Sequence, residues 1–193
     1  MAARPDLPII PFASREAWRS WLEGRHATSD GVWLKIAKKG SGIETVTFAE
    51  ALDVALCYGW IDSQRGGFDG RYFLQRFTPR KPRSRWSQVN REKVARLIES
   101  GEMRPAGLRE VERAKADGRW DAAYEPQSAA KVPDDLRLEL EGNEAAREFF
   151  EKLDRANRYA ILYRIQDAKK QETRARRIAR YVAMLAEGKK LHP

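Results

Sequence analysis

The sequence predicts an α+β fold: a small sheet with a β-hairpin packed by helices in the N-terminal two-thirds, followed by an all-helical C-terminal segment. Three observations carry this prediction. Residues 32–39 are β-branched and aromatic at their start and lie between glycines, two further strand-like runs flank the turn-rich residues 66–70, and the pattern beyond residue 134 is helical. With 193 residues, 42% of them hydrophobic and 10% aromatic, the chain can bury a real core and is not disordered.

The first elements alternate between helix and strand. After an extended start rich in proline, Ser14 is placed to cap a helix with an apolar face that includes Trp18 and Leu22. The strand at 32–39 follows. Thr47 and Glu50 then fit a capping box that opens a helix, and Gly59 is suited to the position after its end.

A hairpin and two helices complete the N-terminal part. Residues 60–64 and 71–78 are predicted to pair across the turn at 66–70. A helix at 87–100 ends at Gly101, and Pro105 suits the first turn of another that stops at Gly118.

The predicted domains are an α+β domain at 1–125, a linker at 126–134 and a helical domain at 135–193. The linker region has two prolines and little periodicity. In the helical domain, Asn143 and Asp154 are placed to cap two helices, and the last helix carries an apolar stripe that ends at Leu185.

Positive charge is concentrated in two blocks. The formal net charge is +9. Residues Arg80–Arg96 hold seven Lys or Arg against one acid, and Arg164–Arg180 hold seven against two. Such clustering favours an anionic partner, although a solvated helix face is the common structural explanation of such a block. Nucleic acid is therefore one possible partner, through both blocks.

The start of the helix at 87–100 is the leading candidate for a ligand site. A helix start binds anions through its free N–H groups and its dipole, and basic residues, which that dipole disfavours, gather here. Ser84 or Ser87 can cap the helix or donate to a ligand, Trp86 offers a flat face for stacking, and Asn90 falls on the inward face of the helix. The structural alternative makes Ser87 a plain cap, Trp86 a core residue and Asn90 a satisfied polar group.

The segment from Gly59 to Asp62 supplies a second set of candidates. If Trp60 points into the core, strand alternation brings Asp62 to the same side, where it needs a cationic partner such as Arg76, Arg80 or Arg83. The pair is either structural or orients an arginine toward an anion. The complete predicted ligand-binding set is Trp60, Asp62, Arg76, Arg80, Ser84, Trp86, Ser87 and Asn90.

Other chemistry has little support in the sequence. His26 and His192 are the only histidines and Cys57 is the only cysteine, so we expect no metal site, no catalytic triad and no intrachain disulfide. Phosphate-binding glycine motifs are missing, and no cofactor is expected. The absence of a signal-like or 18-residue apolar segment favours a cytoplasmic chain without membrane insertion. The sequence leaves the oligomeric state open.

Four segments resemble the YdeI/OmpD-associated family, also labelled bacteriocin-protection proteins. They are EALDVALCYGWIDSQ (50–64), FTPRKPRSRWSQVNREKVARLIESGEM (77–103), AKADGRWDAAY (114–124) and AKKQETRARRIARYVAMLAEG (168–188). The resemblance implies a role in bacterial stress or in protection against antimicrobial peptides. It implies no reaction and no catalytic residue.

Three functions follow as hypotheses. The first is a non-enzymatic protection protein that binds a small anionic ligand at the hairpin and helix start. The second is a nucleic-acid-binding protein. The third and weakest is an enzyme that acts on a phosphorylated or carboxylated substrate with Asp62 as acid or base, because one carboxylate without a nucleophile or metal is a thin basis for catalysis.

Overall fold

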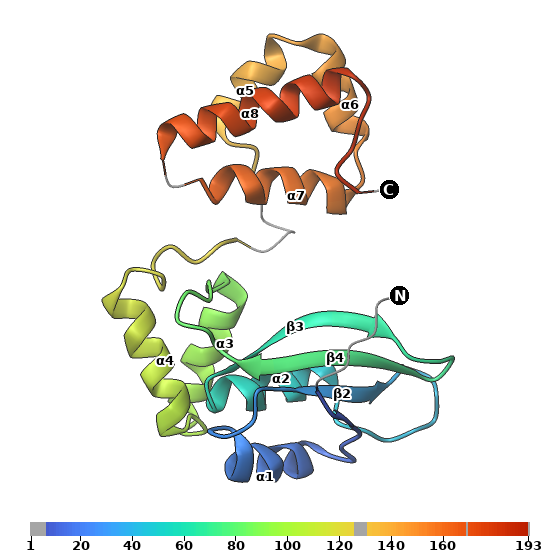
Figure 1. Ribbon diagram of the computed structural model, residues 1–193, viewed down its shortest axis with the longest axis vertical. Helices are drawn as coiled ribbons and strands as arrows, with labels where there is room; N and C mark the ends of the chain where they lie inside the picture. The colour runs from blue at the N-terminus through green and yellow to red at the C-terminus, as the bar shows by residue number, and fades with distance from the viewer. Residues whose placement is uncertain (1–6, 126–130, 169, 193) are drawn as a thin grey trace. The chain divides into compact units, whose positions relative to one another are not determined.

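The computed structural model describes residues 7–125, 131–168 and 170–192. The chain forms two compact units, residues 1–123 and 124–193. The N-terminal unit holds one four-stranded sheet, and the described part of the C-terminal unit is helical apart from its connecting segments (Figure 1). The predicted α+β class is therefore confirmed.

The sheet of the N-terminal unit has the strand order β1-β2-β4-β3, with β1 parallel to β2 and the other pairs antiparallel. α1 and α2 lie against one face of the sheet, and α3 and α4 stand at one end of it (Figure 1). The elements in chain order are β1 (Ile9–Ile10), α1 (Arg15–Arg25), β2 (Val32–Ala37), α2 (Phe48–Cys57), β3 (Trp60–Gly67), β4 (Tyr72–Pro79), α3 (Gln88–Glu99) and α4 (Pro105–Ala116).

Local signals placed the helix starts correctly. The Ser14 hydroxyl accepts from the Ala17 N–H at 3.2 Å, and Thr47 with Glu50 forms the predicted capping box of α2. Gly59 follows α2 with a φ of +75°, a left-handed conformation that glycine adopts without steric cost. β1 was predicted only as extended chain, because two residues are too few for a periodic signal.

Aromatic residues dominate the core between the sheet and its helices. Trp18, Trp60 and Phe77 are at most 1% exposed, and the Trp18 ring lies 5.8 Å from that of Phe77 and 6.3 Å from that of Trp60. The Trp60 indole N–H donates to the His26 carbonyl at 3.1 Å, which satisfies the polar atom of this buried ring. The hairpin is thereby anchored where β3 begins.

The described residues of the C-terminal unit form four helices around an apolar core. They are α5 (Asp134–Glu141), α6 (Glu144–Lys152), α7 (Arg155–Gln166) and α8 (Gln171–Ala186). Asn143 and Asp154 cap α6 and α7 as predicted. α5 begins at the last residue of the predicted linker, and residues 126–130 of that linker lie outside the described residues. No described helix is long and apolar enough to cross a membrane.

Candidate functional site

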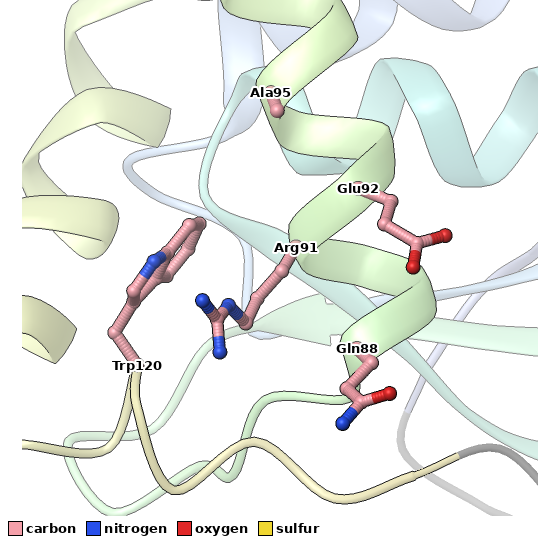
Figure 2. A pocket seen from close by; sticks show the side chains of 5 residues that line it. All are labelled: Gln88, Arg91, Glu92, Ala95 and Trp120. Carbon is pink, nitrogen blue, oxygen red and sulfur yellow. The ribbon is translucent and has the colours of Figure 1, made fainter.

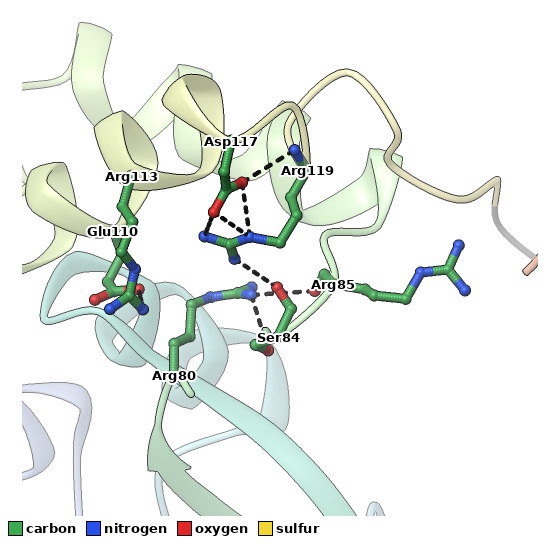
Figure 3. Close-up of polar contacts among 7 residues, drawn as sticks. All are labelled: Arg80, Ser84, Arg85, Glu110, Arg113, Asp117 and Arg119. Carbon is green, nitrogen blue, oxygen red and sulfur yellow. Dashed lines mark hydrogen bonds and ion pairs between the residues drawn. The ribbon is translucent and has the colours of Figure 1, made fainter. Parts of the chain in front are cut away.

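Arg80 organises the loop between β4 and α3 from a buried position. It is 6% exposed, and its Nη1 donates to the Ser84 hydroxyl at 3.4 Å and to the Arg85 carbonyl at 3.2 Å (Figure 3). Its guanidinium carbon lies 3.6 Å from the centroid of the Trp86 ring. Stacking on an aromatic face while donating in the guanidinium plane suits arginine and not lysine. These contacts give Arg80 a structural role in shaping the loop.

A second arginine supports the same loop from the segment after α4. The Arg119 Nη1 donates to the Ser84 carbonyl at 2.8 Å, while its Nε bonds to the Asp117 carboxylate at 2.8 Å (Figure 3). Arg113 pairs with Glu110 on α4 nearby, and the Arg85 side chain extends away from the cluster (Figure 3). The loop before α3 therefore receives hydrogen bonds from two arginines, Arg80 and Arg119.

The predicted residues Trp86, Ser87 and Asn90 are brought together at the start of α3. Ser87 is the N-cap, and its hydroxyl accepts from the Asn90 backbone N–H at 3.2 Å. Trp86 is 2% exposed and its ring meets that of Trp120 edge to face, with centroids 4.9 Å apart. The structural contacts proposed for Ser87 and Trp86 are therefore present, and ligand contact through any of the three stays a prediction.

Asp62 lies on the core face of the hairpin. It stands opposite the buried Phe77 in the strand ladder, while Trp60 stands opposite Pro79, so Asp62 and Trp60 share one face as predicted. Burial raises the pKa of the Asp62 carboxyl above its ordinary value, and the positive charge of Arg80 partly opposes this shift. Arg76 stands opposite Trp33 on β2 and is half-buried.

We predict that Asp62→Asn stabilises the N-terminal unit at pH 7 relative to wild type. Because the pKa of Asp62 is raised in the folded state, the folded carboxyl holds its proton at pH values where the unfolded one has lost it. Its contribution to stability therefore falls as pH rises through the folded-state pKa. Urea unfolding between pH 3 and 7 should show a gain for Asp62→Asn at neutral pH that shrinks toward the acidic end. A loss of stability at neutral pH would contradict this prediction and show that the ionised Asp62 carboxylate stabilises the fold.

An open groove of about 470 Å³ lies beside these residues, between α3 and Trp120 (Figure 2). Gln88, Arg91, Glu92 and Ala95 line it from α3, and Trp120 forms the facing wall. The Arg91 side chain points toward Trp120, and its guanidinium carbon lies 5.2 Å from the indole centroid (Figure 2). None of the eight predicted site residues is in this lining, although Trp86 packs against Trp120 and Ser87 caps the helix that carries the groove.

The groove combines three kinds of surface. Trp120 is only partly buried and presents an aromatic wall, Arg91 supplies a cation, and Gln88 and Glu92 supply hydrogen-bonding groups. The Lys115 amine lies 6.0 Å from the centroid of the indole ring, outside the groove lining, and pairs with Glu112 at 3.0 Å. A site of this composition can hold an anionic ligand that also has a flat part. In the described residues, no group of three or more His, Cys, Asp or Glu side chains could hold a metal ion.

The second basic block is partly engaged inside its own unit. Arg174 bonds to the Asp135 carboxylate at 2.5 and 2.9 Å and to the Ile165 carbonyl at 3.2 Å. Arg177 donates to the Arg164 carbonyl. These arginines satisfy carbonyls in the last turn of α7, where the helix dipole favours positive charge. Nucleic-acid binding through this block stays a prediction.

Comparison with protein families gives two matches. The family described as "Domain of unknown function (DUF8412)" matches residues 10–110, just over half of the chain. The family described as "Bacteriocin-protection, YdeI or OmpD-Associated" matches residues 129–188. The chain is a DUF8412 member that carries a YdeI or OmpD-associated domain. Among curated proteins and among solved structures, nothing matches the chain significantly.

The second match confirms the family resemblance over residues 129–188, which include the resembling segment 168–188. The segments 50–64 and 77–103 fall instead in the DUF8412 range. In this DUF8412 chain, the α3 side of the groove lies within the first matched range. Trp120, on the facing side, lies between the two matched ranges. The groove therefore combines a DUF8412 helix with a wall from the segment that follows it.

Trp120 and Arg91, which line the groove, were not singled out from the sequence. Trp120 was noted only within a family segment, and Arg91 only as one member of a basic block. The signal that could have found Arg91 is its spacing from Gln88 and Ala95, which places all three on one side of α3. Nothing local connects Trp120 to that side, because it lies far along the chain.

Proposed function

We propose that the chain serves a bacteriocin-protection type of role by binding a small anionic ligand in the groove between α3 and Trp120. The family description of residues 129–188 supports the role at a coarse level. The observation that carries the ligand proposal is the groove itself, in which Arg91 meets the partly exposed indole of Trp120. This keeps the predicted ligand class and moves its contacts from the hairpin and helix start to the groove lined by α3 and Trp120.

Charge around the groove supports an anion. Between residues 76 and 85, just before α3, the chain has five Lys or Arg and no acid. Lys81 and Arg83 in this stretch are exposed, so their charges add to the positive potential that attracts anions to this surface. A chain with a net charge of +9 repels cationic peptides. Protection through this site would therefore be indirect, through the ligand.

The proposal predicts that Arg91→Ala removes anion binding while Arg71→Ala does not. Arg71 is an exposed arginine at the hairpin, so this variant loses the same charge away from the groove. Thermal unfolding is measured with inorganic phosphate, sugar phosphates, nucleotides and aromatic carboxylates. A ligand at 100 times its dissociation constant should raise the free energy of unfolding by about 2.7 kcal/mol. If no compound stabilises the wild type, or if Arg91→Ala responds as the wild type does, the proposal is wrong.

A further inference from the structure

We infer that the groove ligand is a nucleobase joined to a sugar phosphate. This inference rests on the proposed function and specifies the ligand of the same site. Inorganic phosphate or a simple carboxylate would contact Arg91 but would make no contact with Trp120, Gln88 or Glu92. The lining as a whole indicates a larger ligand with three different chemical parts.

The aromatic wall indicates a planar ring. The Arg80 guanidinium stacks on one face of Trp86, and the Trp86 ring packs edge to face against Trp120. This packing holds the Trp120 indole in one orientation. Trp120 itself is partly buried and lines the groove. A pre-set indole face is a stacking surface for a base, because every nucleobase has a π-face.

Glu92 restricts the charge of the ligand. Its exposed carboxylate lies one residue from Arg91 in the same lining, so a ligand with negative charge throughout would be repelled there. Sugar hydroxyls donate to carboxylates, and an acidic side chain on a ribose hydroxyl is a recurring mode of nucleotide recognition. The Glu92 side chain leaves α3 on the side away from Trp120 (Figure 2), so a ligand with its phosphate near Arg91 meets Glu92 only at the outer edge of the groove, through its hydroxyls.

The size of the groove fits this ligand class. Sites for small molecules and cofactors measure roughly 300–1,000 Å³, and the groove measures about 470 Å³. Arg91 is half-buried and its guanidinium is held by the Trp120 face. It can turn from the indole to a phosphate when a base takes its place on the ring, because a phosphate offers arginine a two-pronged contact.

The test is calorimetric titration of the full chain with nucleoside monophosphates, with ribose phosphate and free nucleosides as the incomplete ligands. Nucleoside monophosphates should bind more tightly than either part alone. Trp120→Leu, which keeps an apolar side chain without a π-face, should weaken nucleotide binding by roughly 5- to 150-fold and leave ribose phosphate unchanged. Trp120→Phe should restore much of the affinity, which separates stacking from a packing defect. Glu92→Gln should weaken ribonucleotides more than deoxyribonucleotides.

Further titrations show whether the base belongs to a free nucleotide or to a nucleic acid. They also separate this inference from the proposed function. A single-stranded oligonucleotide that binds with the same dependence on Trp120 would support the inference and identify a polymer as the ligand. If aromatic carboxylates bind and nucleotides do not, the inference is overturned and the proposed function stands. Nucleotides that bind no better than ribose phosphate also overturn it. If no anion binds, both fail.

Discussion

Gly107→Ala should lower the free energy of unfolding of the N-terminal unit by about 3 kcal/mol or more. The first turn of α4 packs directly on the last turn of α2. A Cβ atom at residue 107 would lie 2.3 Å from the Cys57 carbonyl oxygen and 2.7 Å from that of Leu56. Both are backbone atoms at a helix end, so no side-chain rotation can relieve the clash. The Arg104 N–H also donates to the Cys57 carbonyl at 3.1 Å, and this bond would be strained as the helices separate.

Gly24→Ala is the matched control. Gly24 lies in α1, and a Cβ atom there would meet nothing within 4 Å. Glycine destabilises a helix by roughly 0.5–1 kcal/mol relative to alanine, so this variant should be slightly more stable than wild type. All six tryptophans lie in residues 1–123, so urea unfolding followed by tryptophan fluorescence reports on this unit. Equal stability of Gly107→Ala and wild type would refute the close packing of α4 on α2.

Arg80→Met should also destabilise the N-terminal unit, by about 3 kcal/mol. Methionine keeps a flexible straight side chain but loses the donors to the Ser84 hydroxyl and the Arg85 carbonyl. Hydrogen bonds from charged groups contribute roughly 1.5–3 kcal/mol each, and the stacking on Trp86 is lost as well. The loop before α3 should loosen as a result.

The control for Arg80→Met is Lys81→Met at the exposed neighbouring residue, which should change stability by less than about 0.5 kcal/mol. Asp62→Asn should stabilise the Arg80→Met variant more than it stabilises wild type, because without the charge of Arg80 the buried Asp62 carboxylate is more costly. Chemical denaturation of wild type, the two single variants and the double variant measures this coupling. Equal effects of Arg80→Met and Lys81→Met would show that Arg80 does not support the loop.

Much of the fold was predictable because its signals are local. Ser14, Thr47, Asn143 and Asp154 each cap the helix that the sequence assigned to them, and Ser87, one of two candidates with Ser84, caps α3. A capping residue and its N–H partner lie within three residues, so the sequence alone contains the whole interaction. The core face of Asp62 was likewise predictable from strand alternation.

The groove was not predictable in the same way. Its wall at Trp120 meets α3 through tertiary packing on Trp86, and no sequence pattern encodes a contact between residues so far apart. The concentration of basic residues before α3 drew attention to Arg80. In the structure Arg80 is buried, and Arg91 lines the groove. Basic residues with a structural role and those that line a surface look alike in a sequence.

The most direct test of the groove as a ligand site is a titration followed through the tryptophan indole N–H signals in NMR spectra. The six tryptophans give one signal each, assignable by single Trp→Phe variants. Inorganic phosphate, benzoate and adenosine monophosphate are added in turn. We expect at least one of them to shift the Trp120 signal strongly and the Trp86 signal less, while the signals of Trp18 and Trp60 in the core stay in place. A stationary Trp120 signal with all three anions at saturating concentration would contradict it.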